Sequence, residues 1–278
     1  MDEPDMAQSR VSGLPGIVFD EVGGGPPLIF LHGIGGNRTN WTEQQYHMAD
    51  MFTTIAWDAR GYGLSEDYEG PLQFSQFSDD LNRLLDFRRI DSAHFVGLSM
   101  GARILMNFFS SASDRVSTLT LCDCFYSFGA ALSADKQAEF IALRQKPLRS
   151  GMTLGDIAPK LIESLVSPNC RSEVKARLHE SILDLHVESY LKTVAASMSF
   201  DMSGELVDFD IPVQLIFGEH DRLTPPSIGR IMMTQMPNAR LQVIKDAGHI
   251  SNMEQPSDFN NILRSFLTPN LGMAKFQR

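Results

Sequence analysis

Short apolar runs alternate with amphipathic stretches over the first part of the chain and again near its end. Continuous apolar runs of about four to eight residues are typical of strands buried on both faces, and apolar residues at every third or fourth position are typical of helices. The runs predicted to be strands are 26–31, 52–57, 93–97, 116–123, 213–218 and 241–245. The stretches predicted to be helices are 77–90, 100–109 and 256–267. This alternation predicts an α/β fold with a mostly parallel central sheet flanked by helices.

The alternation breaks in the middle of the chain, where strand-like runs disappear. The helical patterns that follow one another there are 134–145, 153–166 and 171–198. We therefore predict a core of residues 1–124 and 206–278 with an inserted all-helical cap of residues 125–205. Some apolar cap residues are candidates to face a ligand, although ordinary packing explains such spacing more often. These residues are Met152, Leu161, Leu165, Met198 and Phe200.

Charge and hydropathy exclude several classes of protein. The chain has 34 acidic and 24 basic residues and a net charge of −10, so it would repel phosphate backbones, and nucleic acid is not expected as a partner. No apolar run reaches the roughly 18 residues of a membrane-spanning helix, so no membrane is expected as a partner either. The N-terminus lacks the basic start and apolar run of a secretory signal, which predicts a cytoplasmic location. Whether the chain forms a homo-oligomer is left open.

The three cysteines, Cys122, Cys124 and Cys170, do not have the paired spacing of a zinc site. Buried thiols pack as small apolar groups. We therefore assign no chemistry to cysteine.

A G-x-S-x-G sequence, Gly97-Leu98-Ser99-Met100-Gly101, lies between the predicted strand 93–97 and the predicted helix 100–109. A serine on such a strand-to-helix turn is held at the carboxyl end of the sheet with its hydroxyl exposed. The alternative is a glycine-rich turn with an ordinary capping serine. The strand before the motif and the helix after it favour Ser99 as a nucleophile.

A serine nucleophile needs a base to accept its proton and an acid to orient that base. Of seven histidines, only His249 follows the last predicted strand and precedes the last predicted helix, so it is the predicted base. Asp221 follows the penultimate strand, and Asp123 ends the strand before the cap. Both lie at the carboxyl edge of the sheet. We favour Asp221 because the acid of this arrangement usually follows the penultimate strand.

A tetrahedral intermediate needs two backbone donors for its oxyanion. The amide of Met100, at a helix N-terminus just after the serine, is one candidate. The other is the amide of Ile34, in the glycine-rich loop H-G-I-G-G-N that follows the first predicted strand.

Three polar residues near these loops are interpreted as structural. His32, ahead of the proposed donor Ile34, is expected to support its loop by hydrogen bonds rather than to act as a second base. Asp58 and Arg60 lie beside turn glycines and are expected to tie down their loop by hydrogen bonds and charge.

Five motifs occur in a fixed order: H-G, D-x-R-G-x-G-x-S, GLSMG, G-E-H-D and A-G-H. In this order they resemble the α/β-hydrolase superfamily over about residues 15–268. The GLSMG motif, the triplet Leu121-Cys122-Asp123 and the segment 248–256 are similar to the 3-oxoadipate enol-lactonase group and its esterase relatives. The resemblance implies hydrolysis of a small carboxylic ester or lactone through an acyl-enzyme on Ser99, with no metal or organic cofactor.

Other functions remain open on the same scaffold. Hydrolases that cleave carbon–carbon bonds of ring-fission products commonly carry a tryptophan soon after the histidine, whereas Ile250, Ser251 and Asn252 stand there in this chain. A cofactor-free perhydrolase and a small-molecule receptor without turnover are the other two alternatives.

The negative charge of the chain also bears on the substrate. It favours a neutral ester or lactone unless the cap is locally basic. Cations that could make it so, or could equally form a solvated helix face, are Arg144, Lys146, Arg149 and Lys160.

Overall fold

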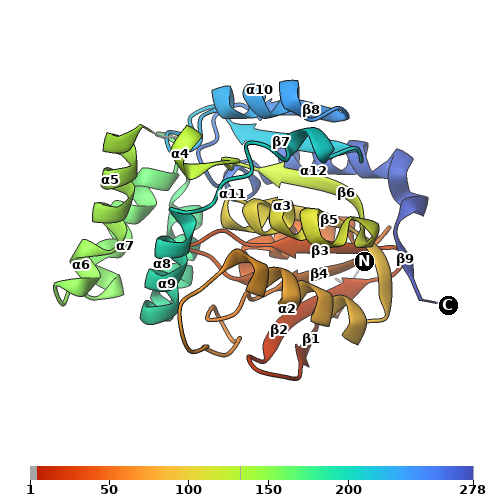
Figure 1. Cartoon of the computed structure of the whole chain (residues 1–278), viewed down its shortest axis with the longest axis horizontal. Coiled ribbons are helices and arrows are strands. Elements are labelled where there is room, and N and C mark those ends of the chain that lie inside the picture. Colours follow the sequence, from red (N-terminus) through yellow and green to blue (C-terminus); the bar gives the residue numbers. More distant parts are fainter. Residues whose placement is uncertain (1–4, 132, 278) are drawn as a thin grey trace.

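A computed structural model describes residues 5–131 and 133–277. Within them the chain forms a nine-stranded sheet with flanking helices (Figure 1). The strands are β1 (Ala7–Val11), β2 (Ile17–Gly23), β3 (Pro27–Leu31), β4 (Thr53–Trp57), β5 (Ile90–Leu98), β6 (Val116–Cys122), β7 (Val213–Gly218), β8 (Ala239–Ile244) and β9 (Lys275–Phe276). Their spatial order is β1-β2-β4-β3-β5-β6-β7-β8, and the short β9 pairs with β5.

The centre of the sheet is parallel. Strands β4, β3, β5, β6, β7 and β8 pair in parallel with one another in this order. Every residue of β3, β4, β6 and β7 is buried. Helices cover both faces of a parallel sheet, so its strands are buried on both sides and carry continuous apolar runs. The predicted α/β class and all six predicted strands are confirmed, each strand within a few residues of its expected bounds.

Two strands at one edge were not predicted from the sequence. Strand β1 pairs antiparallel with β2, and β2 pairs antiparallel with β4. Most residues of β1 are exposed, and β2 carries Asp20 and Glu21 in its middle. Strand β1 is the solvated edge strand, and Asp20 and Glu21 interrupt the apolar residues of β2, so neither has the continuous apolar run that marks a central strand.

Helices of the core pack on the two faces of the sheet (Figure 1). Helices α2 and α3 pack against each other and against β5, and α1 packs against α12. The core helices are α1 (Thr42–Met48), α2 (Phe74–Phe87), α3 (Met100–Ala112), α10 (Pro226–Gln235), α11 (Ser251–Glu254) and α12 (Pro256–Leu267). Short 3₁₀ turns are η1 (Arg38–Trp41), η2 (Ser113–Arg115), η3 (Leu206–Asp208) and η4 (Thr268–Met273). No helix in the described ranges is long and apolar enough to cross a membrane.

The segment between β6 and β7 is helical and gathers at one end of the sheet, at the left of Figure 1. Its helices are α4 (Phe128–Ala131), α5 (Ala134–Arg144), α6 (Lys146–Arg149), α7 (Leu154–Leu165), α8 (Ser172–Leu183) and α9 (Val187–Ser197). The helical pattern 171–198 forms two helices rather than one. Between them His186 is extended, and its ring bonds to Asp67 and to the carbonyl oxygen of Gly63. These bonds hold the break against the core.

Backbone and side-chain bonds join the cap to the loop after β8. The His249 amide donates to the Leu165 carbonyl oxygen at 2.7 Å. The Glu254 carboxylate accepts from the amides of Ser167 and Gly248, at 2.9 and 2.8 Å. The end of α7 is therefore fixed directly over the loop that carries His249.

The histidine at the centre of β5 should make stability depend on pH. His94 is fully buried, its Nδ1 lies 2.9 Å from the Thr118 hydroxyl, and burial lowers its pKa to about 4. The unfolded chain takes up this proton near pH 6.5, so protonation favours unfolding as the pH falls from about 6.5 to about 4. Relative to His94→Gln, the wild type should lose up to about 3 kcal/mol of unfolding free energy over this window. Urea denaturation at several pH values measures the difference, and a difference that does not change with pH would contradict the argument.

Candidate active site

Ser99 occupies the predicted turn between β5 and α3. Its backbone has φ 53° and ψ −106°, a strained conformation for a residue with a side chain. The glycines on either side allow the close packing of this turn. A Cβ on Gly101 would lie 2.2 Å from the carbonyl oxygen of Leu31, and one on Gly97 would lie 2.5 Å from the Gly101 carbonyl carbon. Ser99 is thereby held against the carboxyl end of β3.

His249 and Asp221 form a buried pair. His249 Nδ1 lies 2.8 Å from Asp221 Oδ2, and both side chains are almost fully buried. The Thr224 hydroxyl donates to the same Asp221 oxygen at 2.5 Å, and the amides of Leu223 and Thr224 donate to Asp221 Oδ1 at 2.8 and 2.9 Å. Four contacts therefore hold the carboxylate, one with His249 and three with Leu223 and Thr224. Its orientation leaves His249 Nε2 for a group in the pocket.

Sequence reasoning did not single out Thr224. Its position three residues after Asp221 is the spacing at which an Asp side chain commonly bonds to the following turn, and this spacing is the signal that could have found it.

Asp123, the competing acid, does not reach His249. Its Oδ1 accepts from the Gly218 amide at 2.7 Å, and its Oδ2 accepts from the Ser251 hydroxyl at 2.5 Å. Burial, and next the nearby Asp221 carboxylate, raise the pKa of Asp123 well above its usual range. Asp123 thus joins the end of β7 to the segment after β8 by two hydrogen bonds.

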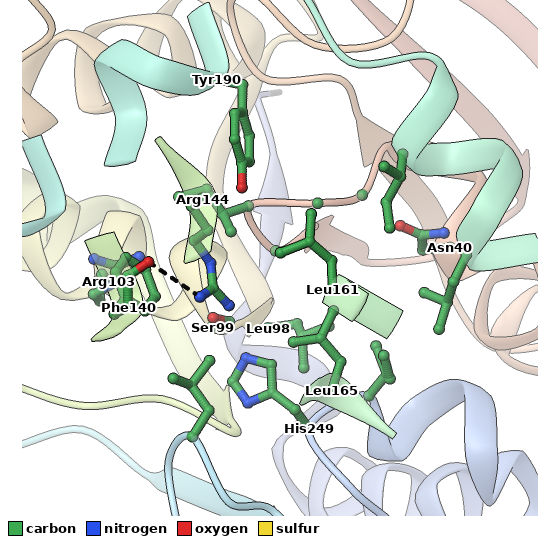
Figure 2. Close-up of a pocket in the computed structure, with 18 of the residues that line it drawn as sticks. Asn40, Leu98, Ser99, Arg103, Phe140, Arg144, Leu161, Leu165, Tyr190 and His249 are labelled. Carbon is green, nitrogen blue, oxygen red and sulfur yellow. Dashed lines mark hydrogen bonds between the residues drawn. The ribbon is translucent and has the colours of Figure 1, made fainter. Parts of the chain in front are cut away.

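Ser99 and His249 line one pocket between core and cap (Figure 2). No hydrogen bond joins their side chains in the described structure, a common state of such pairs without a substrate. The remaining lining residues are Gly33, Ile34, Gly35, Gly36, Asn40, Leu98, Arg103, Phe125, Phe140, Arg144, Leu161, Leu165, Leu178, Ile182, Tyr190, Leu223 and Ile250.

Only part of the apolar cap set faces this pocket. Leu161 and Leu165 line it. Met152 and Met198 are exposed, and Phe200 packs on Phe74 with ring centroids 4.8 Å apart. As candidates to face a ligand in this pocket, Met152, Met198 and Phe200 are therefore wrong, and the preferred interpretation of ordinary packing holds for Phe200. A helical spacing of apolar residues does not distinguish a pocket wall from ordinary packing.

The two predicted oxyanion donors belong to segments next to Ser99. Ile34 lines the pocket, and its neighbour Gly33 passes close to the serine, so that a Cβ there would lie 3.5 Å from Ser99 Cβ. Met100 is the first residue of α3, and amides of the first helical turn have no partner within the helix. The amides of Ile34 and Met100 remain the candidates to hold an oxyanion at Ser99.

The ring of His32 is engaged outside the pocket. Its Nε2 accepts from the Ala59 amide at 3.1 Å, and its Nδ1 lies 2.8 Å from the Gly33 carbonyl oxygen. Because an amide donates to Nε2, the proton is on Nδ1. Burial lowers the pKa of His32, which favours this neutral ring.

Asp58 and Arg60 fix the loop after β4. Asp58 accepts from the amides of Arg38 and Leu64 and from the Arg38 guanidinium, at 2.7 to 2.8 Å. Arg60 forms a two-bond ion pair with the buried carboxylate of Asp80 at 2.6 and 2.8 Å. Neither residue lines the pocket.

Two of the three cysteines are buried, and Cys170, in the cap segment 125–205, is partly buried. Cys122 and Cys124 are buried, and burial raises the pKa of each thiol.

In the described ranges, one group of side chains could offer three ligand atoms to a metal ion. It consists of the exposed residues Glu219, His220 and Asp246, which do not line the pocket.

Residues 28–262 match the model of the alpha/beta hydrolase family. The chain belongs to this family. Among its curated relatives, 3-oxoadipate enol-lactonase 2 of Acinetobacter baylyi is 27% identical over 243 residues, which cover 87% of this hydrolase and 88% of the relative.

Solved structures give the same result. A thermophilic esterase from Thermogutta terrifontis superimposes with a TM-score of 0.85 at 26% identity, covering 95% of this hydrolase and 99% of the esterase. Est816, described as an N-acyl homoserine lactone degrading enzyme, has a TM-score of 0.82 at 25% identity over 93% of this chain and 100% of its own. The α/β-hydrolase fold and the resemblance to enol-lactonases and esterases, both predicted from the sequence, are confirmed.

Proposed function

We propose that this hydrolase cleaves small carboxylic esters or lactones through an acyl-enzyme on Ser99. The observation that carries the proposal is the His249–Asp221 pair, because Asp221 holds Nδ1 of a histidine that lines the same pocket as Ser99. Hydroxyl, imidazole and carboxylate in this relation form a nucleophile, a base and an orienting acid. The enol-lactonase and esterase relatives support this choice of bond.

In the first half-reaction, Ser99 Oγ attacks the carbonyl carbon while His249 Nε2 takes the hydroxyl proton. The amides of Ile34 and Met100 donate to the oxyanion that forms. Asp221 holds the proton of His249 on Nδ1 and stabilises the imidazolium. The intermediate collapses to the acyl-enzyme as the bond to the leaving oxygen breaks, and His249 gives its proton to that oxygen.

In the second half-reaction, water takes the place of the alcohol. His249 removes a proton from the water, which attacks the acyl carbon. Collapse of the second intermediate breaks the bond to Ser99, and His249 returns the proton to Ser99 Oγ. For a lactone, the leaving oxygen stays in the product, which is a hydroxy acid or, from an enol-lactone, a keto acid.

A substrate panel tests the reaction class. We expect at least one member among 4-nitrophenyl esters of different chain length, neutral lactones and an enol-lactone to reach a kcat/KM of about 10⁴ M⁻¹s⁻¹ or more. A ring-fission product and a peracid assay with hydrogen peroxide belong in the same panel. Preferred turnover of either would redirect the assignment to carbon–carbon hydrolysis or to perhydrolysis. Binding without turnover of any compound would indicate a receptor and overturn the proposal.

A further inference from the structure

Two arginines are buried in the wall of the pocket. Arg103 comes from α3, the helix that begins after Ser99, and Arg144 comes from the end of the cap helix α5. They are only 2% and 3% exposed, and both line the pocket. In residues 5–131 and 133–277, no carboxylate forms an ion pair with either guanidinium. The pocket thus holds two cations that the protein does not neutralise.

Arg103 is surrounded by aromatic rings. Its guanidinium carbon lies 4.7, 5.3 and 5.7 Å from the ring centroids of Phe125, Phe74 and Phe200. Its Nη1 is buried without a hydrogen-bond partner. Burial lowers the pKa of Arg103 to about 10, and Arg144 adds to the lowering. The group therefore remains a cation at neutral pH and keeps an unused donor.

Arg144 extends from the cap toward the part of the pocket where Ser99 and His249 lie (Figure 2). Its Nη1 donates to the Phe140 carbonyl oxygen at 3.4 Å, and its guanidinium lies 4.0 Å from the centroid of the Phe140 ring. Burial lowers the pKa of Arg144. A long bond to one carbonyl and contact with a ring leave most of its five donors for a ligand.

The rest of the pocket shows where the ligand's apolar part would lie. Side chains from α7 and α8 form an apolar wall, with Leu161, Leu165 and Ile182 among them.

A groove beside the pocket shares Phe140, Arg144 and Leu223 with it. Three cations, Lys136, Lys160 and Arg222, and two anions, Glu139 and Glu163, line that groove. The charged side chains of this groove are therefore net positive on a chain of net charge −10.

Buried unpaired guanidiniums are costly unless an anion joins them, and Arg is the side chain best suited to hold a carboxylate by two parallel bonds. We propose that Arg103 and Arg144 form a carboxylate subsite, so that the substrate is an ester or lactone that carries a second, ionised carboxylate. The proposal rests on the proposed function, whose reacting carbonyl it places at Ser99. It reverses the preference for neutral substrates that net charge alone suggested.

A matched pair of substrates tests the subsite. Mono-4-nitrophenyl glutarate and 4-nitrophenyl pentanoate have acyl chains of equal length and differ chiefly in the terminal carboxylate. In the wild type, kcat/KM should be at least about 10-fold higher for the glutarate ester. Arg144→Met should remove most of this preference and lower the ratio of the two values by about 10-fold or more, because one cation of the subsite is lost.

Arg149→Met is the matched control because Arg149 is an exposed arginine of the same cap region. The same charge is lost, but the ratio should stay within about 2-fold of the wild type, since exposed charges contribute little. Arg144→Lys, which keeps the charge, should keep more of the ratio than Arg144→Met. Equal loss in the Arg144 and Arg149 variants would overturn the subsite, because the effect would then come from overall charge.

Two measurements do not depend on turnover of the charged ester or on the folding of an arginine variant. Glutarate should bind to Ser99→Ala in calorimetry, and it should inhibit wild-type pentanoate ester hydrolysis competitively, whereas 1,5-pentanediol should do neither. Glutarate binding to a protein that hydrolyses no ester would remove the proposed function and keep the anion subsite. Ester hydrolysis with no glutarate binding and no preference for the charged ester would remove the subsite and keep the proposed function.

Discussion

Ser99→Ala should lower kcat for the best ester or lactone by at least about 10⁴-fold. In the proposed mechanism the hydroxyl oxygen bonds to the acyl group, and Ser99 is the only serine among the described residues that line the pocket. The residual rate should come from the oxyanion donors and from binding alone. Steady-state hydrolysis of a 4-nitrophenyl ester by wild type and variant measures the loss.

The strained backbone at position 99 belongs to the turn, so alanine should leave the fold intact. Thermal unfolding of Ser99→Ala should therefore stay close to that of the wild type, and glutarate should still bind. A stable, ligand-binding Ser99→Ala protein with wild-type turnover would show that another group is the nucleophile.

Asp221→Asn should lower kcat by about 10³-fold to 10⁴-fold. The amides of Leu223 and Thr224 donate to Asp221 Oδ1, so an asparagine would place its oxygen there and its NH₂ group toward His249. His249 Nδ1 would then have to accept, and the ring proton would move to Nε2. In that tautomer the ring cannot take the proton of Ser99.

Asp123→Asn is the matched control, because the two acids lie at the same edge of the sheet and only Asp221 contacts His249. An asparagine oxygen can still accept from the Gly218 amide, so we expect less than about 10-fold loss of kcat. Hydrolysis rates of the two variants decide between the acids. A larger loss in Asp123→Asn than in Asp221→Asn, at equal thermal stability, would assign the orienting role to Asp123.

The sequence predicts the centre of this fold better than its edges. Buried parallel strands carry continuous apolar runs, and strand β7 has the predicted bounds 213–218. Strand β1 lies at the solvated edge, and Asp20 and Glu21 interrupt the apolar residues of β2, so neither strand has such a run. The break between α8 and α9 depends on bonds from His186 to Asp67 and Gly63, which are distant in the chain. Local pattern cannot show a helix end fixed by distant partners.

Much the same division applies to the site. Ser99, Asp221 and His249 follow strands whose carboxyl ends meet at one edge, so topology and chain order were enough to place them together. The choice between Asp221 and Asp123 depended on the usual position of the acid in such hydrolases. The structure shows that Asp221 contacts His249, whereas Asp123 bonds to Gly218 and Ser251. Arg103 comes from a core helix and Arg144 from a cap helix, and no spacing in the chain predicts that they line one pocket or that no carboxylate among the described residues pairs with them.

Detection of an acyl group on Ser99 is the most direct test of the proposed mechanism. Wild-type protein mixed with 4-nitrophenyl acetate and quenched in acid during the first turnovers should carry an acetyl group on the peptide that contains Ser99, as seen by peptide mass spectrometry. The fraction acetylated should match the initial burst of 4-nitrophenol and should be absent in Ser99→Ala. Steady hydrolysis with an acetyl group on another residue, or with none on Ser99 at any quench time in spite of a burst, would contradict the central claim.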